Sequence, residues 1–182
     1  ARVITFKGRT QVIVPGAMAT MAYEPNSGKE LWRVIHGGMN ACIPPLFSDG
    51  KLFITTSSPS KLLAVRPDGI GDVTKTHVEW TARTGVPARP SQLLVGDSMF
   101  MVDNSGVASC IDTATGKPRW TKRIAGKFTA SPVLVGDRIY CFQREMGKSH
   151  VFAADPKKYR ELATNTLDAG CMASPAVPNG LF

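Results

Sequence analysis

Residues 91–100 read SQLLVGDSMF, and residues 131–140 repeat that stretch without a gap as SPVLVGDRIY. A third copy, PLFSDGKLF, occupies residues 45–53, and a further copy begins with SPAV at residue 174. Each full copy holds two apolar, β-rich runs that a Gly-Asp or Asp-Gly pair separates, which is typical of a hairpin. The repeat returns every 40 to 48 residues, and this period indicates β-propeller blades rather than ankyrin or leucine-rich repeats.

A second signature follows each of the first three copies. Residues 22–32 read AYEPNSGKELW and residues 110–120 read CIDTATGKPRW, while residues 64–80 form a longer version with an insertion that carries Gly69 and Gly71. We expect Asp112 to accept hydrogen bonds from the amides of the turn, and a glycine to supply its positive φ. A large flat side chain then fills the space between neighbouring blades. The predicted structural residues are Trp32, Trp80, Trp120, Gly28, Gly116 and Asp112.

Each repeat contains four strand-like segments and none reads as an ordinary helix. We therefore predict an all-β chain, a β-propeller of four-stranded antiparallel blades in the WD40-like manner, with about four blades present. The whole chain, 1–182, is expected to form one partial propeller domain. Its blades are predicted at 1–36, 37–83, 84–124 and 125–166, with the start of a fifth at 167–182. In the fourth repeat we match Ala153-x-Asp155 to the signature, with Ala163 at the place of the tryptophan.

The signature Ala-x-Asp-x-x-Thr-Gly-Lys-x-x-Trp resembles the tryptophan-docking motif of the pyrroloquinoline-quinone-type (PQQ-like) propeller repeats. That superfamily includes quinoprotein dehydrogenases and the propeller lipoprotein of the outer-membrane β-barrel assembly machinery. The resemblance covers essentially the whole chain and implies a ring of seven or eight blades. It implies that the remaining blades come from the same longer chain, which we favour, or from a second copy. It also implies a periplasmic or otherwise extracytoplasmic location in a bacterium.

Composition narrows the function only partly. The 22 Lys and Arg residues exceed the 14 Asp and Glu residues, so the net charge is +8, which permits an acidic partner. No apolar stretch is long enough for a transmembrane segment, and no exposed aromatic platform predicts nucleic-acid binding. The four cysteines are scattered without a CxxC pair, so we predict free thiols and no zinc or other metal site.

Basic residues gather in the connectors that lead from the outer strand of one blade to the inner strand of the next. These connectors carry only one acid, Asp168. We predict that they form a basic rim that binds a protein partner or an anionic ligand; the alternative interpretation is that they are solvated strand ends. The candidate residues are His36, Asn40, Arg83, Arg89, Lys122 and Lys127.

Two functional hypotheses remain open. The first is a non-catalytic binding scaffold with no cofactor and no catalytic residues, since the three histidines are dispersed and lack a Ser or Cys partner at a recognisable spacing. The alternative is a fragment of a PQQ-dependent quinoprotein oxidoreductase. The resemblance implies that such an enzyme uses PQQ, Ca²⁺ and adjacent cysteines, and adjacent cysteines are absent from this sequence.

Overall fold

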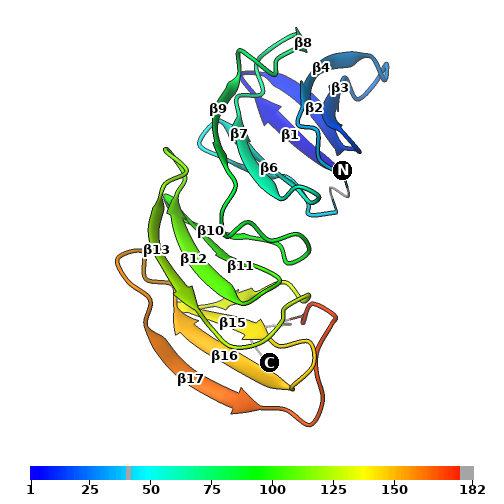
Figure 1. The fold of residues 1–182 in the computed structure, drawn as a ribbon. Coiled ribbons are helices and arrows are strands. Elements are labelled where there is room, and N and C mark those ends of the chain that lie inside the picture. Colours follow the sequence, from blue (N-terminus) through cyan, green and yellow to red (C-terminus); the bar gives the residue numbers. More distant parts are fainter. Residues whose placement is uncertain (40–41, 177–182) are drawn as a thin grey trace. The chain divides into compact units, whose positions relative to one another are not determined.

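The computed structural model describes residues 1–39 and 42–176, and this part of the chain contains seventeen strands and no helix. Sixteen of the strands form four antiparallel four-stranded sheets, and the one remaining strand, from the insertion in the second repeat, adds to the first sheet. The predicted fold class is confirmed: the chain is an all-β partial propeller with four blades. It divides into two compact units, Ala1–Ala88 and Arg89–Phe182, each with two blades (Figure 1). No helix of the described residues is long and apolar enough to cross a membrane.

In every blade the strands pair in chain order. Blade 1 contains β1 (Arg2–Phe6), β2 (Arg9–Pro15), β3 (Ala19–Tyr23) and β4 (Glu30–Ile35). Blade 2 contains β5 (Leu46–Ser48), β6 (Lys51–Thr56), β7 (Lys61–Val65) and β9 (Val78–Ala82). Blade 3 contains β10 (Leu93–Val95), β11 (Ser98–Val102), β12 (Val107–Asp112) and β13 (Pro118–Arg123). Blade 4 contains β14 (Val133–Val135), β15 (Arg138–Phe142), β16 (Lys148–Ala153) and β17 (Glu161–Thr166).

The first hairpins of blades 1 and 2 follow from their turn residues. Asp49 and Gly50 both have positive φ, 49° and 70°, as a two-residue type I′ turn requires. Lys7 and Gly8 show the same pair of positive angles, 49° and 76°, so a lysine takes the first position of the turn here. These turns place β1 against β2 and β5 against β6 in the register that the apolar runs need.

The insertion in the second repeat extends blade 1. It forms β8 (Gly71–Asp72), which pairs in parallel with β4 so that Trp32 lies opposite Gly71. Directly after β8, Val73 is buried in the core of the unit, beside Ile13, Trp32 and Leu52. Blade 2 therefore lends a strand to blade 1, and the two blades share one hydrophobic core.

The second unit has a more aromatic core, because Trp120 lies where blades 3 and 4 meet. Its ring centroid lies 6.0 Å from that of Phe100 in blade 3, and 6.2 Å and 5.6 Å from those of Phe152 and Tyr159 in blade 4. A serine contact also repeats: Ser91 N donates to Ser131 Oγ, and Ser131 N donates to Ser174 Oγ, both at 2.9 Å. Ser174 thus stands to blade 4 as Ser131 stands to blade 3.

The predicted match of the fourth repeat is wrong by two residues. Ala163 does occupy the place of the tryptophan, but it pairs with Val151, as Trp120 pairs with Cys110. Ala153 N donates to Arg160 O where Asp112 N donates to Lys117 O, so Ala153 holds the position that we assigned to Asp155. The turn between β16 and β17 is two residues longer than its counterpart, and counting back from Ala163 missed this difference.

The predicted start of a fifth blade is only partly within the described residues. Residues 167–176 contain no strand. Residues 177–182, where that strand would continue, lie outside the described part.

Candidate functional site

The tryptophan turns are held by carboxylates. Asp112 Oδ1 accepts hydrogen bonds from the backbone N and the Oγ1 of Thr115, both at 2.9 Å, and Asp112 Oδ2 accepts one from Arg119 at 2.7 Å. The Arg119 guanidinium and the Thr115 hydroxyl lower the pKa of Asp112 to about 2. Gly116 and Gly28 have φ values of 70° and 69°, which close the two turns before Trp120 and Trp32.

The indole groups are engaged inside the blades. Trp32 is fully buried, and its Nε1 donates to Gln11 Oε1 at 2.7 Å, while Gln11 Nε2 donates to Pro67 O in the second repeat at 2.9 Å. Trp120 Nε1 donates to Asp155 O at 2.9 Å. Trp80 is half-buried, with its ring centroid 5.9 Å from that of Phe53.

Thiols, indole rings and clusters of metal ligands are the groups relevant to a site for PQQ with Ca²⁺. Two of the four thiols, Cys110 and Cys141, are buried, and desolvation raises the pKa of both, that of Cys110 to about 11. Trp32 is fully buried, and the half-buried ring of Trp120 packs against aromatic rings of blades 3 and 4. Within residues 1–39 and 42–176, no three His, Cys, Asp or Glu side chains gather into a possible metal site.

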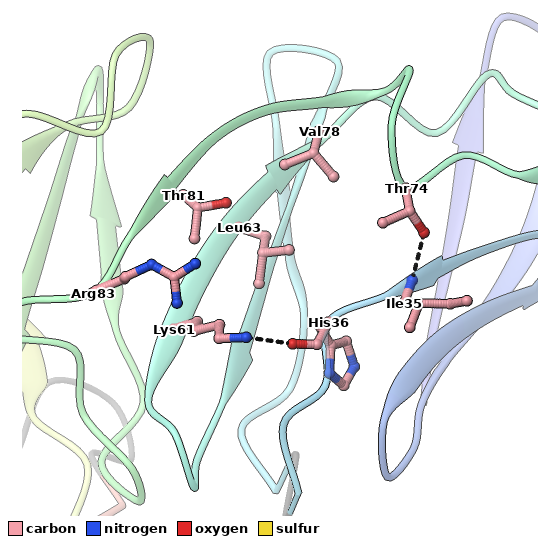
Figure 2. Close-up of a pocket in the computed structure, with 8 residues that line it drawn as sticks. All are labelled: Ile35, His36, Lys61, Leu63, Thr74, Val78, Thr81 and Arg83. Carbon is pink, nitrogen blue, oxygen red and sulfur yellow. Dashed lines mark hydrogen bonds between the residues drawn. The ribbon is translucent and has the colours of Figure 1, made fainter.

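A shallow pocket opens in the first unit, where the end of β4 meets β7 and β9. Its volume is about 170 Å³. It brings together two predicted rim residues, His36 and Arg83, with the lysine at the start of β7 (Figure 2). Its lining consists of Ile35, His36, Lys61, Leu63, Thr74, Val78, Thr81 and Arg83. The lining therefore contains cations, hydroxyl groups and an apolar floor, and no carboxylate.

The two cations of the pocket differ in their partners. Lys61 Nζ donates to the carbonyl oxygen of His36 at 2.6 Å, which ties β7 to the end of β4. The Arg83 guanidinium is exposed and has no hydrogen-bond or ion-pair partner among the described residues. Sequence reasoning missed Lys61 because it lies at the start of a third strand and not in a connector. Only the pairing of the blades brings it to this end.

Both nitrogens of the His36 ring form hydrogen bonds within blade 1 and its connector. The backbone N of Gly38 donates to Nδ1 at 3.2 Å, so Nε2 carries the proton and donates to Thr20 Oγ1 at 3.3 Å. Burial, and then the charge of Lys61, lower the pKa of His36. The lowered pKa favours the neutral ring at pH 7, so His36 does not add to the positive charge of the pocket.

Exposed apolar side chains border the same end of blade 1. Met18, Ile35 and Met39 are 53%, 48% and 51% exposed. Met18 O accepts hydrogen bonds from the backbone N of both His36 and Gly37, so the turn before β3 is fastened to the connector after β4. Hydrophobic side chains and unneutralised cations thus occur together on this end of the unit.

The other predicted rim residues do not form a uniformly basic surface. Lys127 Nζ lies 3.4 Å from Glu145 Oε1, and the connector around Lys127 is hydrogen-bonded to the turns that carry Asp103 and Glu145. Those turns lie between second and third strands, so an inventory of the connectors alone missed their acids. Lys122 and Arg89 are exposed, and Asn40 lies outside the described residues.

The four blades and the repeated tryptophan turn define a PQQ-like β-propeller. The family model for outer membrane protein assembly factor BamB matches residues 17–162. The chain belongs to that family. No curated protein matches it.

Solved structures share the fold. BamB from Moraxella catarrhalis superposes with a TM-score of 0.69 at 18% identity, over 94% of this chain and 53% of that one. Quinohemoprotein alcohol dehydrogenase from Comamonas testosteroni superposes with a TM-score of 0.66 at 9% identity, over 92% of this chain and 34% of that one. The Cps50 (Swd1) β-propeller domain of Myceliophteria thermophila superposes with a TM-score of 0.57 at 12% identity, over 91% of this chain and 59% of that one. This chain thus spans about half of the Moraxella protein.

Proposed function

We propose that this chain is part of a non-catalytic, cofactor-free propeller that works outside the cytoplasm as a protein-binding scaffold in outer-membrane protein assembly. The observation that carries the proposal is the end of the first unit where Arg83 has no partner among the described residues and Met18, Ile35 and Met39 are exposed. The family to which the chain belongs supports the process and the location.

The surface has the composition of a binding surface. Protein interfaces are enriched in methionine and arginine, and they combine a few apolar anchors with charged and polar groups that set orientation. The first unit presents these groups on strand ends and short turns that are hydrogen-bonded to one another, so little ordering is needed when a partner binds. A rigid site of this kind is suited to recognition.

Site-specific cross-linking in cells tests this proposal. A photoreactive residue in place of Met18 or Met39 of the full-length protein should cross-link to components of outer-membrane assembly, identified by mass spectrometry. Asn26 is the matched control, because it is exposed at the opposite end of the strand that follows Met18. Equal cross-linking from Asn26 and from the two methionine positions would contradict the proposal.

A spectral titration tests the absence of a cofactor. Purified full-length protein should leave the absorbance of PQQ unchanged in the presence of Ca²⁺. A saturable change would favour the quinoprotein alternative over the scaffold.

A further inference from the structure

We propose that the pocket of Lys61 and Arg83 binds one Asp or Glu side chain of an extended, acidic and apolar segment of the partner protein. The inference rests on the proposed function, since it names what that surface binds. The two cations hold the carboxylate, while Ile35 and the neighbouring methionines contact the apolar side chains that flank it.

No carboxylate of the described first unit forms an ion pair with Lys61 or Arg83, so both cations can bind an acidic side chain. An ammonium has three donors, and Lys61 uses one of them on the carbonyl oxygen of His36. Asp72 lies on the strand that borders the pocket, but its Oδ1 accepts from the backbone N of Thr74 at 2.9 Å and from Thr74 Oγ1 at 2.5 Å. Glu79 on β9 pairs with Lys51 and Arg66, at 3.6 Å and 3.8 Å. Neither carboxylate is therefore paired with Lys61 or Arg83 among the described residues.

The size and floor of the pocket favour a single side chain. Sites for cofactors and drug-sized ligands enclose about 300–1,000 Å³, whereas this pocket holds about 170 Å³. Leu63 and Val78 form an apolar floor that can contact the methylene groups of an acidic side chain, and Thr81 places a hydroxyl beside the cations (Figure 2). A carboxylate on a short aliphatic stem matches this arrangement.

A protein carboxylate fits better than an anionic membrane surface. Polybasic segments that bind anionic lipids gather about four to eight Lys or Arg residues. The pocket offers two cations, and the third ionisable group that lines it, His36, is held neutral. Exposed apolar side chains next to only two cations are typical of a site for a peptide segment.

The repeat supplies a matched control. Strand pairing places Lys148 in blade 4 at the position of Lys61 in blade 2, because Val151 pairs with Ala163 as Ala64 pairs with Trp80. At the same register Thr166 replaces Arg83, so the lysine of blade 4 lacks a neighbouring arginine there. Lys148→Gln therefore removes an equivalent charge without touching the pocket.

Fluorescence anisotropy with labelled peptides tests the inference on the full-length protein. The probe is the acetylated and amidated peptide Leu-Thr-Leu-Asp-Leu-Thr-Leu, and its counterpart has Asn in place of Asp. We expect the Asp peptide to bind about five- to tenfold more tightly, with the difference shrinking as salt is added. Arg83→Gln and Lys61→Gln should each remove most of that preference, and Lys148→Gln should leave it unchanged.

The inference is overturned if both peptides bind equally, if the preference survives in Arg83→Gln, or if Lys148→Gln removes it as well. Binding to vesicles with phosphatidylglycerol that Arg83→Gln abolishes, without a preference for the Asp peptide, would assign the pocket to lipid and also overturn it. Cross-linking from Met18 and Met39 is scored separately. Cross-links that persist without an Asp preference would refute the pocket assignment and leave the scaffold function standing.

Discussion

The hydrogen bond from Trp32 to Gln11 gives the sharpest prediction about what holds the first unit together. Both residues are fully buried, and Gln11 passes the connection on to Pro67 O in the second repeat. Trp32→Phe removes the indole N–H but keeps an aromatic ring in the core. The change leaves Gln11 Oε1 without its donor in a place that water does not reach.

The expected cost has two parts. A buried acceptor left without a partner costs about 1–3 kcal/mol. Complete truncation of a buried tryptophan to alanine costs about 3–5 kcal/mol, and Phe retains much of that packing, so the smaller ring adds about 1 kcal/mol. Trp32→Phe should therefore lower the free energy of unfolding by about 2–4 kcal/mol. Trp120→Phe should cost less, since its indole donates to the carbonyl oxygen of Asp155, which is only half-buried.

Urea unfolding followed by circular dichroism on the full-length protein measures these costs, with Gln11→Leu and the double variant completing a mutant cycle. Gln11→Leu leaves the indole N–H unpaired, while Pro67 O keeps its second donor, Arg9 Nη2 at 2.9 Å. The double variant removes both the indole N–H and its acceptor, so it leaves neither group unpaired. The double variant should therefore be about 2–3 kcal/mol more stable than additivity predicts. Additive costs, within about 0.5 kcal/mol, would refute the argument that this bond stabilises the unit.

Two further predictions concern Gln143, which bonds to His150 and lies beside Gly126. Burial lowers the pKa of His150, as it does that of His36, and Gln143 Nε2 donates to His150 Nε2 at 3.0 Å, so protonation would set two donors against each other. Unfolded histidines take up protons near pH 6.5, so stability should be greatest above that value and fall as the pH drops toward about 5. Urea midpoints should fall less with pH in His150→Gln than in wild type, and an identical fall would argue against this role. A Cβ on Gly126, whose φ is 102°, would meet the Gln143 amide, whereas Gly96, with φ of 58°, has open space around it. Gly96→Ala should cost about 1 kcal/mol from backbone strain and Gly126→Ala about 1–3 kcal/mol more, as midpoints of thermal unfolding can show; equal costs would mean that Gln143 moves aside freely.

The fold could be predicted from the sequence because its signals are local. A Gly-Asp pair between two apolar runs predicts a hairpin wherever it occurs, and repetition every 40 to 48 residues turns hairpins into blades. The same reasoning failed in the fourth repeat, where a turn two residues longer moved the signature. Spacing along the chain cannot distinguish a longer turn from a shifted strand, and only the pairing of Val151 with Ala163 settles the register.

The candidate site was less predictable because it depends on which strand ends lie together. His36 and Arg83 could be named from the connectors, and they do line one pocket. Lys61 could not be named, since its place beside them depends on the packing of β7 against the end of β4. The acids of the second unit could not be named either. Asp103 and Glu145 lie in the turns between the second and third strands of their blades, and these turns contact the connectors.

The least regular segment of the chain also contributes to the site. The insertion in the second repeat breaks the spacing between Ala64 and Trp80, and it supplies β8, which covers the edge of blade 1 opposite Trp32. The residue two positions after β8, Thr74, accepts a hydrogen bond from the backbone N of Ile35 at 2.8 Å and lines the pocket. A blade without this insertion would leave the outer edge of β4 unpaired and the pocket open on that side. The insertion therefore joins two blades into one core and, with the same residues, shapes the surface at their shared end.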